Sequence, residues 1–176
     1  MTDDVKVCAE ILEKAIRFEE TGMAFFKERA KNAPSQLERR LFSSLAEDEI
    51  GHKAHLIKMR HDLLEADSVD VLAPPAEHDH DDPREIFEQA LAGASDPYEA
   101  ESDELEIIKG AMDIERNGYA MYSSAVEQVS SERAKEIFRH LAAEEQNHYA
   151  LLKNTYDYLS EPEAWHGFDE SPMLDG

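Results

Sequence analysis

The residues of this sequence best suited to chemistry are two copies of a Glu-x-x-His motif and two separate glutamates. On a helix, residues three apart lie on the same face one turn apart, so each motif presents a carboxylate and an imidazole side by side. Every one of these residues interrupts a row of apolar residues at helical spacing, which predicts that they point into a protein core. The six residues are Glu19, Glu49, His52, Glu115, Glu145 and His148.

Four carboxylates that converge in a core need a positive partner, because burial of unpaired charge is costly. Two divalent cations balance four carboxylates, while two neutral imidazoles add no charge. Carboxylate oxygens with some imidazole suit iron or manganese better than copper, and the lack of thiolate ligands argues against a structural zinc site. The pattern therefore predicts two iron ions as the cofactor, with manganese as the alternative. In the competing interpretation the six groups pair among themselves or face solvent.

An internal duplication relates these residues to one another. Residues 11–56 aligned with residues 107–152, without a gap, give 13 identities in 46 positions, where unrelated sequences of average composition would share about three. The constant offset of 96 pairs Glu19 with Glu115, and it also pairs the two Glu-x-x-His motifs. Each copy is therefore expected to build half of the metal site.

Each copy reads as a hairpin of two long helices. The predicted helices cover residues 4–32, 35–66, 97–129 and 132–160, and Ala33-Pro34 separates the first pair. Ser35 and Glu38 form a predicted capping box at the start of the second helix, and Pro97 is placed at the start of the third. Between the hairpins, a polar linker and a short helix from Pro83 to about Gly93 are long enough to cross the whole bundle.

Two antiparallel hairpins joined by one long crossover are the connectivity of a ferritin-like four-helix bundle. The predicted fold is therefore all-α. Residues 1–160 are expected to form one domain that includes the crossover over residues 67–96, and residues 161–176 are expected to form a C-terminal tail.

Composition excludes several classes of protein. The net charge of −22 disfavours nucleic acid as a partner, because phosphate binding needs clustered Lys and Arg. The longest apolar runs are too short to cross a bilayer, and the first residues lack the pattern of a signal peptide, so a cytoplasmic location is expected. Cys8 is the single cysteine and is expected to be a small core residue.

Four further residues near the six are singled out. Gly22 and Gly118 follow the separate glutamates by one turn, and they either leave room for dioxygen or peroxide or allow close helix packing. Tyr119 and Tyr122 are expected in the core, with a hydrogen bond or a radical role at the site as the alternative.

Two segments outside the duplication remain. The run His78-Asp79-His80 is expected to be a solvated linker, with loose metal binding as the alternative. The tail residues Trp165, Phe168 and Met173 are expected to pack back on the bundle, with docking on a partner as the alternative.

With these residues in place, the sequence resembles the rubrerythrin branch of the ferritin-like superfamily over residues 5–160. The phrases Glu115-Arg-Asn-Gly-Tyr-Ala-Met-Tyr122 and Leu141-Ala-Ala-Glu-Glu-Gln-Asn-His148 carry the resemblance together with Glu19 and Glu49-Ile50-Gly51-His52. The resemblance implies a non-haem di-iron site that reacts with peroxide or dioxygen, and a homodimer.

Two departures from that family pattern matter. Rubrerythrins carry a rubredoxin domain with four cysteines, which this sequence cannot build, so electrons are expected from a separate donor protein. They also carry a second glutamate one turn after the ligand on the third helix, where this sequence has Gly118. The resemblance is closer to rubrerythrin-like proteins that have the ferritin-like domain alone.

Three hypotheses for function follow. The first is a di-iron oxidoreductase of the peroxidase or ferroxidase type, with Glu19 and Glu115 as terminal ligands, Glu49 and Glu145 as bridging ligands, and one histidine for each ion. The second is non-enzymatic iron binding or storage. The third is a helical interaction module with a degenerate metal site.

Overall fold

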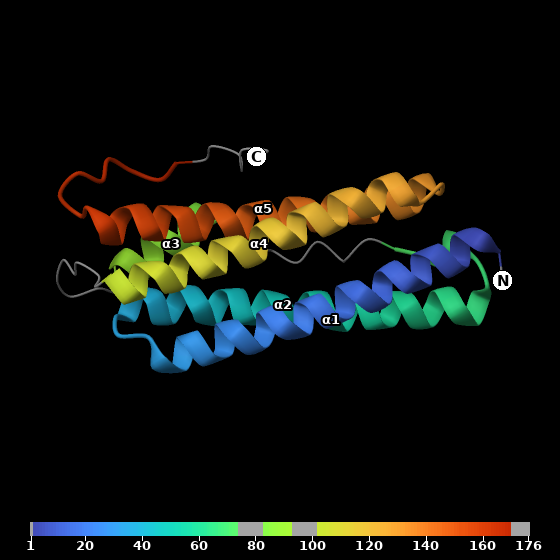
Figure 1. The fold of residues 1–176 in the computed structure, drawn as a ribbon, viewed down its shortest axis with the longest axis horizontal. Helices are drawn as coiled ribbons and strands as arrows, with labels where there is room; N and C mark the ends of the chain where they lie inside the picture. The colour runs from blue at the N-terminus through green and yellow to red at the C-terminus, as the bar shows by residue number, and fades with distance from the viewer. Residues whose placement is uncertain (1, 74–82, 93–101, 170–176) are drawn as a thin grey trace.

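The computed structural model describes residues 2–73, 83–92 and 102–169, and within these ranges every element is helical. Four long helices run side by side as an elongated bundle (Figure 1). They are α1 (Asp3–Asn32), α2 (Gln36–Ala66), α4 (Ser102–Gln128) and α5 (Glu132–Ser160). The predicted all-α, ferritin-like bundle of two hairpins is confirmed.

Local signals set the ends of the helices. The side chain of Ser35 accepts a hydrogen bond from the Glu38 backbone N–H at 3.1 Å, and Glu38 Oε2 accepts one from the Ser35 backbone N–H at 3.3 Å. This is the predicted capping box, and it starts α2 where the sequence pattern placed it. Ser131 caps α5 in the same way by accepting from the Ala134 backbone N–H at 3.4 Å. The predicted third helix is observed from Ser102, while residues 97–101 lie outside the described ranges.

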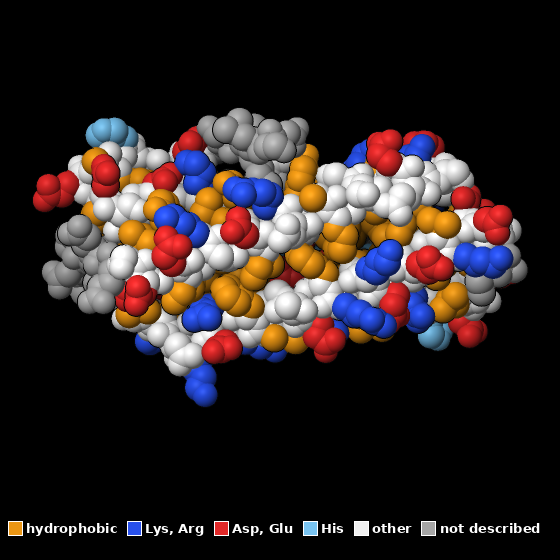
Figure 2. Space-filling view, viewed as in Figure 1, with side chains coloured by type: hydrophobic (Ala, Val, Ile, Leu, Met, Phe, Trp, Pro, Cys, Tyr) orange, Lys and Arg blue, Asp and Glu red, His pale blue; other side chains and the backbone are white. Residues whose placement is uncertain are grey.

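The hairpins, rather than the four helices equally, are the packing units. The backbones of α1 and α2 approach each other closely, as do those of α4 and α5, whereas α1 and α4, and α2 and α5, approach closely at fewer positions. Charged side chains of both signs are scattered over the face formed by α1 and α4, with apolar side chains between them (Figure 2). No described helix has the length and apolar character needed to span a membrane.

The described parts of the crossover lie at opposite ends of the bundle. A single 3₁₀ turn, η1 (Val69–Val71), follows α2 and is anchored where the backbone oxygen of Leu72 accepts a hydrogen bond from Arg133. The short helix α3 (Pro83–Ala92) packs against α2 and α5 at the other end (Figure 1). The run His78-Asp79-His80 falls outside the described residues.

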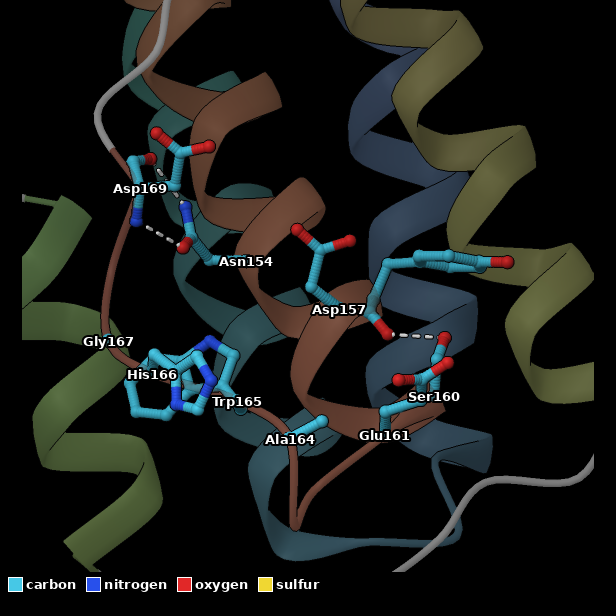
Figure 3. Close-up of a pocket in the computed structure, with 10 residues that line it drawn as sticks. Asn154, Asp157, Ser160, Glu161, Ala164, Trp165, His166, Gly167 and Asp169 are labelled. Carbon is cyan, nitrogen blue, oxygen red and sulfur yellow. Dashed lines mark hydrogen bonds between the residues drawn. The ribbon is translucent and has the colours of Figure 1, made fainter.

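The beginning of the C-terminal tail folds back along α5. Asn154 is almost fully buried, donates from Nδ2 to the backbone oxygen of Asp169 at 2.8 Å, and accepts from the Asp169 backbone N–H at 2.6 Å (Figure 3). Trp165 and Phe168 contact the ring of Phe87 on α3. The tail thus packs on the bundle up to residue 169, as expected for Trp165 and Phe168, while Met173 lies outside the described residues.

Candidate metal centre

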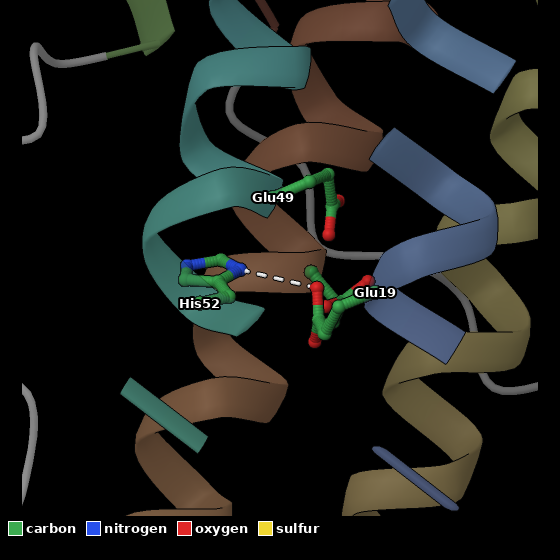
Figure 4. A group of neighbouring side chains, drawn as sticks. Glu19, Glu49 and His52 are labelled. Atoms are coloured by element: carbon green, nitrogen blue, oxygen red, sulfur yellow. Dashed lines mark ion pairs between the residues drawn. The ribbon is translucent and has the colours of Figure 1, made fainter. Parts of the chain in front are cut away.

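The structure brings the six predicted residues together in the middle of the bundle. Helices α1 and α4 each supply one glutamate, and α2 and α5 each supply a glutamate and a histidine. In Figure 4, Glu19, Glu49 and His52 point toward one another from α1 and α2, and His52 Nδ1 lies 3.6 Å from Glu19 Oε2. All six side chains are buried, with 5% or less of each residue exposed.

The six residues form two overlapping groups, each able to surround one ion. In each group, one nitrogen or oxygen atom from every residue lies within 4.8 Å of the others. Glu49 and Glu145 belong to both groups, whereas Glu19 and His52 belong to one and Glu115 and His148 to the other. The groups are Glu19, Glu49, His52 and Glu145, and Glu49, Glu115, Glu145 and His148.

Two apolar clusters enclose this polar centre. Along α1, the cluster that contains Leu12 and Ala15 lies on one side of Glu19, and the cluster that contains Phe26 lies on the other. The other three long helices also contribute residues to both clusters. Water is therefore excluded from both ends of the site, so charges placed there interact strongly.

The shared glutamates are the groups most disturbed by this setting. Burial, followed by the nearby charge of Glu19, raises the pKa of Glu49 well above its usual range. Burial, followed by the charge of Glu115, raises the pKa of Glu145 in the same way. Burial would also raise the pKa of Glu19, but contacts with Glu49, His52 and Tyr122 outweigh it and lower the pKa to about 2. Without cations, Glu49 and Glu145 therefore favour the protonated form, whereas Glu19 stays ionised.

His148 presents its two nitrogens to different partners. Nδ1 lies 3.4 Å from Glu115 Oε2 and 3.7 Å from Glu49 Oε1, inside the cluster. Nε2 lies 3.3 Å from Asp48 Oδ2, at the edge of the site. A carboxylate on one imidazole nitrogen is the usual way to fix the other nitrogen toward a metal ion. Sequence reasoning missed Asp48. The available signal was an acid before each Glu-x-x-His motif, Asp48 in one copy and Glu144 in the other.

Tyr122 places its hydroxyl at the site. The hydroxyl donates a hydrogen bond to Glu19 Oε1, and the ring stacks on Phe138 with centroids 6.5 Å apart. Burial, followed by the charge of Glu19, raises the pKa of Tyr122 well above its usual value, so the phenol keeps its proton. Tyr119 instead packs against one of the apolar clusters.

The two glycines near the site differ in their surroundings. A Cβ on Gly118 would lie 2.7 Å from Glu145 Cδ and 2.8 Å from the ring of Phe18, which is too close for either. A Cβ on Gly22 would be 3.4 Å from Glu49 Cδ, an ordinary contact. At Gly118, the space that a side chain would fill is therefore taken by a carboxylate of the cluster and by the Phe18 ring.

The cluster has the unmet bonding capacity that a metal site requires. Both carboxylate oxygens of Glu115, both of Glu145, Oε2 of Glu19 and of Glu49, and Nδ1 of His148 are buried without a hydrogen-bond partner among the described residues. Buried polar atoms are rarely left in this state, because each costs about 1–3 kcal/mol. Carboxylate oxygens and imidazole nitrogens that face one another without hydrogen bonds between them fit divalent cations of the iron and manganese type.

Fold and cluster together define a ferritin-like helical bundle with a buried carboxylate–histidine site able to hold metal. The family model described as Rubrerythrin matches residues 10–156. The chain therefore belongs to the rubrerythrin family, a family associated with iron. No curated protein and no solved structure gives a significant match.

Proposed function

We propose that this protein is a di-iron carboxylate oxidoreductase that reduces peroxide or dioxygen with electrons from a separate donor protein. The observation that carries the proposal is that Glu49 and Glu145 belong to both four-residue groups. Two carboxylates placed between two sets of ligands suit a pair of ions that share bridging ligands. A single ion would leave the outer glutamate and histidine of one group without a role.

The proposed ligand set balances its own charge. Glu19 and Glu115 would act as terminal ligands, Glu49 and Glu145 would be shared by the two ions, and His52 and His148 would each bind one ion. Four carboxylates offset two divalent ions, and imidazole binds without adding charge. Two ferrous ions, when bound, would supply the two electrons that convert one hydrogen peroxide and two protons into two molecules of water.

The chain contributes the setting for that reaction. Asp48 orients the imidazole of His148 so that Nδ1 faces the cluster. Tyr122 keeps a proton on its hydroxyl and directs it at Glu19 Oε1. The apolar clusters on either side exclude bulk water. This limits side reactions of the oxidant and strengthens the electrostatic interactions of the carboxylates inside the site.

Stopped-flow oxidation of the iron-loaded protein tests the proposal. Metal-free protein is loaded anaerobically with two equivalents of ferrous iron and mixed with hydrogen peroxide, and ferric absorbance is followed. The wild type is expected to bind both ions and oxidise rapidly, whereas Glu49→Ala loses a bridging ligand and is expected to bind less iron and oxidise more slowly. Glu47→Gln, an exposed change two residues away, serves as the control and should match the wild type. Equal binding and rates in wild type and Glu49→Ala would reject the proposal.

A homodimer and a cytoplasmic location remain predictions attached to this proposal. Light scattering of the iron-loaded protein examines the assembly. A dimer agrees with an oxidoreductase that meets a separate donor protein, whereas a large closed shell would favour iron storage instead.

A further inference from the structure

The two halves of the cluster are related by the duplication, but a single residue type breaks their equivalence. Tyr122 corresponds to Phe26 at the offset of 96 residues. Its hydroxyl donates to Glu19 Oε1, so Oε2 is the oxygen of that carboxylate left without a hydrogen-bond partner among the described residues. Phe26 has no hydroxyl and stacks on Phe42 with ring centroids 6.2 Å apart. Glu115 accordingly keeps both of its oxygens without a hydrogen-bond partner among the described residues.

The glycine pair breaks the equivalence a second time. Gly118 and Gly22 are also partners in the duplication, yet only Gly118 lies so close to a carboxylate that a methyl group would collide with it. The Glu145 carboxylate therefore occupies the space next to the backbone of α4 at Gly118. The Glu49 carboxylate instead lies at an ordinary contact distance from the Cβ position of Gly22 on α1. The shared glutamates thus take different positions relative to the two helices that flank them.

We propose that the two cation positions are inequivalent, and that Tyr122 and Gly118 are positioning residues that make them so. Tyr122 limits the terminal carboxylate Glu19 to one ligating oxygen, while Glu115 can offer two. Gly118 provides the space that Glu145 occupies against α4. This inference rests on the proposed two-metal site and adds that divalent transition cations bind there in two distinct steps.

Cobalt titration of the metal-free protein in the absence of oxygen is the principal test. Cobalt(II) has visible absorption that depends on its coordination number, so each equivalent reports its own ligand set. In the wild type, the first and second equivalents are expected to give spectra of different shape. Tyr122→Phe frees Glu19 Oε1, so that Glu19 can offer two oxygens as Glu115 does. The variant is expected to change one binding constant by about tenfold, the size typical for loss of an outer-shell partner, and to change the spectrum of that equivalent alone. Tyr119→Phe, the same substitution one turn away, should leave both constants and both spectra unchanged.

The glycines supply a second, internally matched test. Gly118→Ala is expected to displace Glu145 and weaken cobalt binding by about tenfold or more, whereas Gly22→Ala should bind like the wild type. Alanine favours a helix over glycine by about 1 kcal/mol, so a general loss of helix stability would not explain a defect at position 118. If Gly118→Ala fails to fold, the tyrosine variants decide the question alone.

The outcomes separate this inference from the proposed function. A wild type that binds two cobalt ions with identical spectra, with Tyr122→Phe unchanged from it, overturns the inequivalence and leaves the two-metal site standing. Equal effects of Gly118→Ala and Gly22→Ala overturn the role of Gly118. A wild type that binds neither cobalt nor ferrous iron overturns both proposals together.

Discussion

Replacement of Glu145 by glutamine should stabilise the metal-free protein while it destroys the metal site. Glu145 is fully buried, both of its oxygens lack hydrogen-bond partners among the described residues, and its pKa is raised well above the usual range. The carboxylate therefore destabilises the fold unless a cation or a proton neutralises it. Glutamine has the same shape, carries no charge, and can donate to the carboxylates around it.

The size of the gain follows from the cost of neutralising the acid. An unfolded glutamate has a pKa of about 4.3, so protonating it at pH 7.3 costs about 4 kcal/mol, at about 1.36 kcal/mol for each pH unit. That is the upper limit, since the folded protein can always take up the proton instead. The lower limit is about 1 kcal/mol, the smallest cost of a buried unsatisfied group. An increase of about 1–4 kcal/mol in the free energy of unfolding is expected at pH 7.3.

The dependence on pH gives the prediction its sign. A carboxyl whose pKa is raised on folding contributes its full stability below its unfolded pKa and loses it as the pH rises through its folded pKa. The wild type therefore loses stability from this group between about pH 4.3 and neutrality, while the variant has no such group. The difference between Glu145→Gln and wild type should shrink toward zero as the pH falls to about 4.3.

Urea unfolding of chelator-treated protein at several pH values measures the effect. Glu136→Gln, an exposed change on the same helix, is the control and should lie within about 0.5 kcal/mol of wild type. With ferrous iron at one hundred times the dissociation constant of each site, the wild type should gain about 2.7 kcal/mol for each ion bound, while the variant gains less. A Glu145→Gln protein that is less stable than wild type without metal at pH 7.3 would refute the reasoning.

Three further predictions concern regions away from the cluster. Cys8 is fully buried, and burial followed by the charge of Asp4 raises the pKa of its thiol to about 11. The thiol should therefore react with a thiol reagent only at the rate of unfolding, and rapid reaction of the native protein would contradict this. Ser35→Ala removes the cap of α2 and should cost about 1 kcal/mol in urea unfolding, whereas Ser44→Ala, inside the same helix, should not. Asn154→Ala removes both hydrogen bonds to Asp169 and should speed proteolysis of the C-terminal tail, and an unchanged cleavage rate would show that the contacts of Trp165 and Phe168 suffice to hold the tail.

The sequence predicted those parts of the structure that depend on local signals and periodicity. The capping box at Ser35 and the start of α5 after Ser131 depend on residues within one turn, so they were placed correctly. The sequence also predicted that the six polar residues lie close together. They interrupt the apolar stripes of the four helices, so helices that bury those stripes against one another also bring these residues together.

Other features depended on how the helices rotate against each other and on side-chain rotamers. The contact of Asp48 with His148 joins residues of different hairpins, and periodicity alone does not reveal it. The hydroxyl of Tyr122 had several conceivable partners, and only the packing of α4 against α1 selects Glu19. The filled space at Gly118 likewise could not be predicted, because a glycine at that position is compatible both with room for a small molecule and with close helix packing.

The closer backbone approach within each hairpin than between the hairpins gives the cluster a second consequence. Each four-residue group takes members from both hairpins, so a cation bound there would tie the two hairpins together in addition to the apolar clusters they share. An isolated hairpin carries two glutamates and a histidine, and two identical hairpins would assemble a symmetric version of the same centre. Duplication and fusion of such an ancestral hairpin would have allowed the two copies to diverge. Tyr122 in one copy and Phe26 at the matching position of the other are such a difference, which a dimer of two identical hairpins could not have.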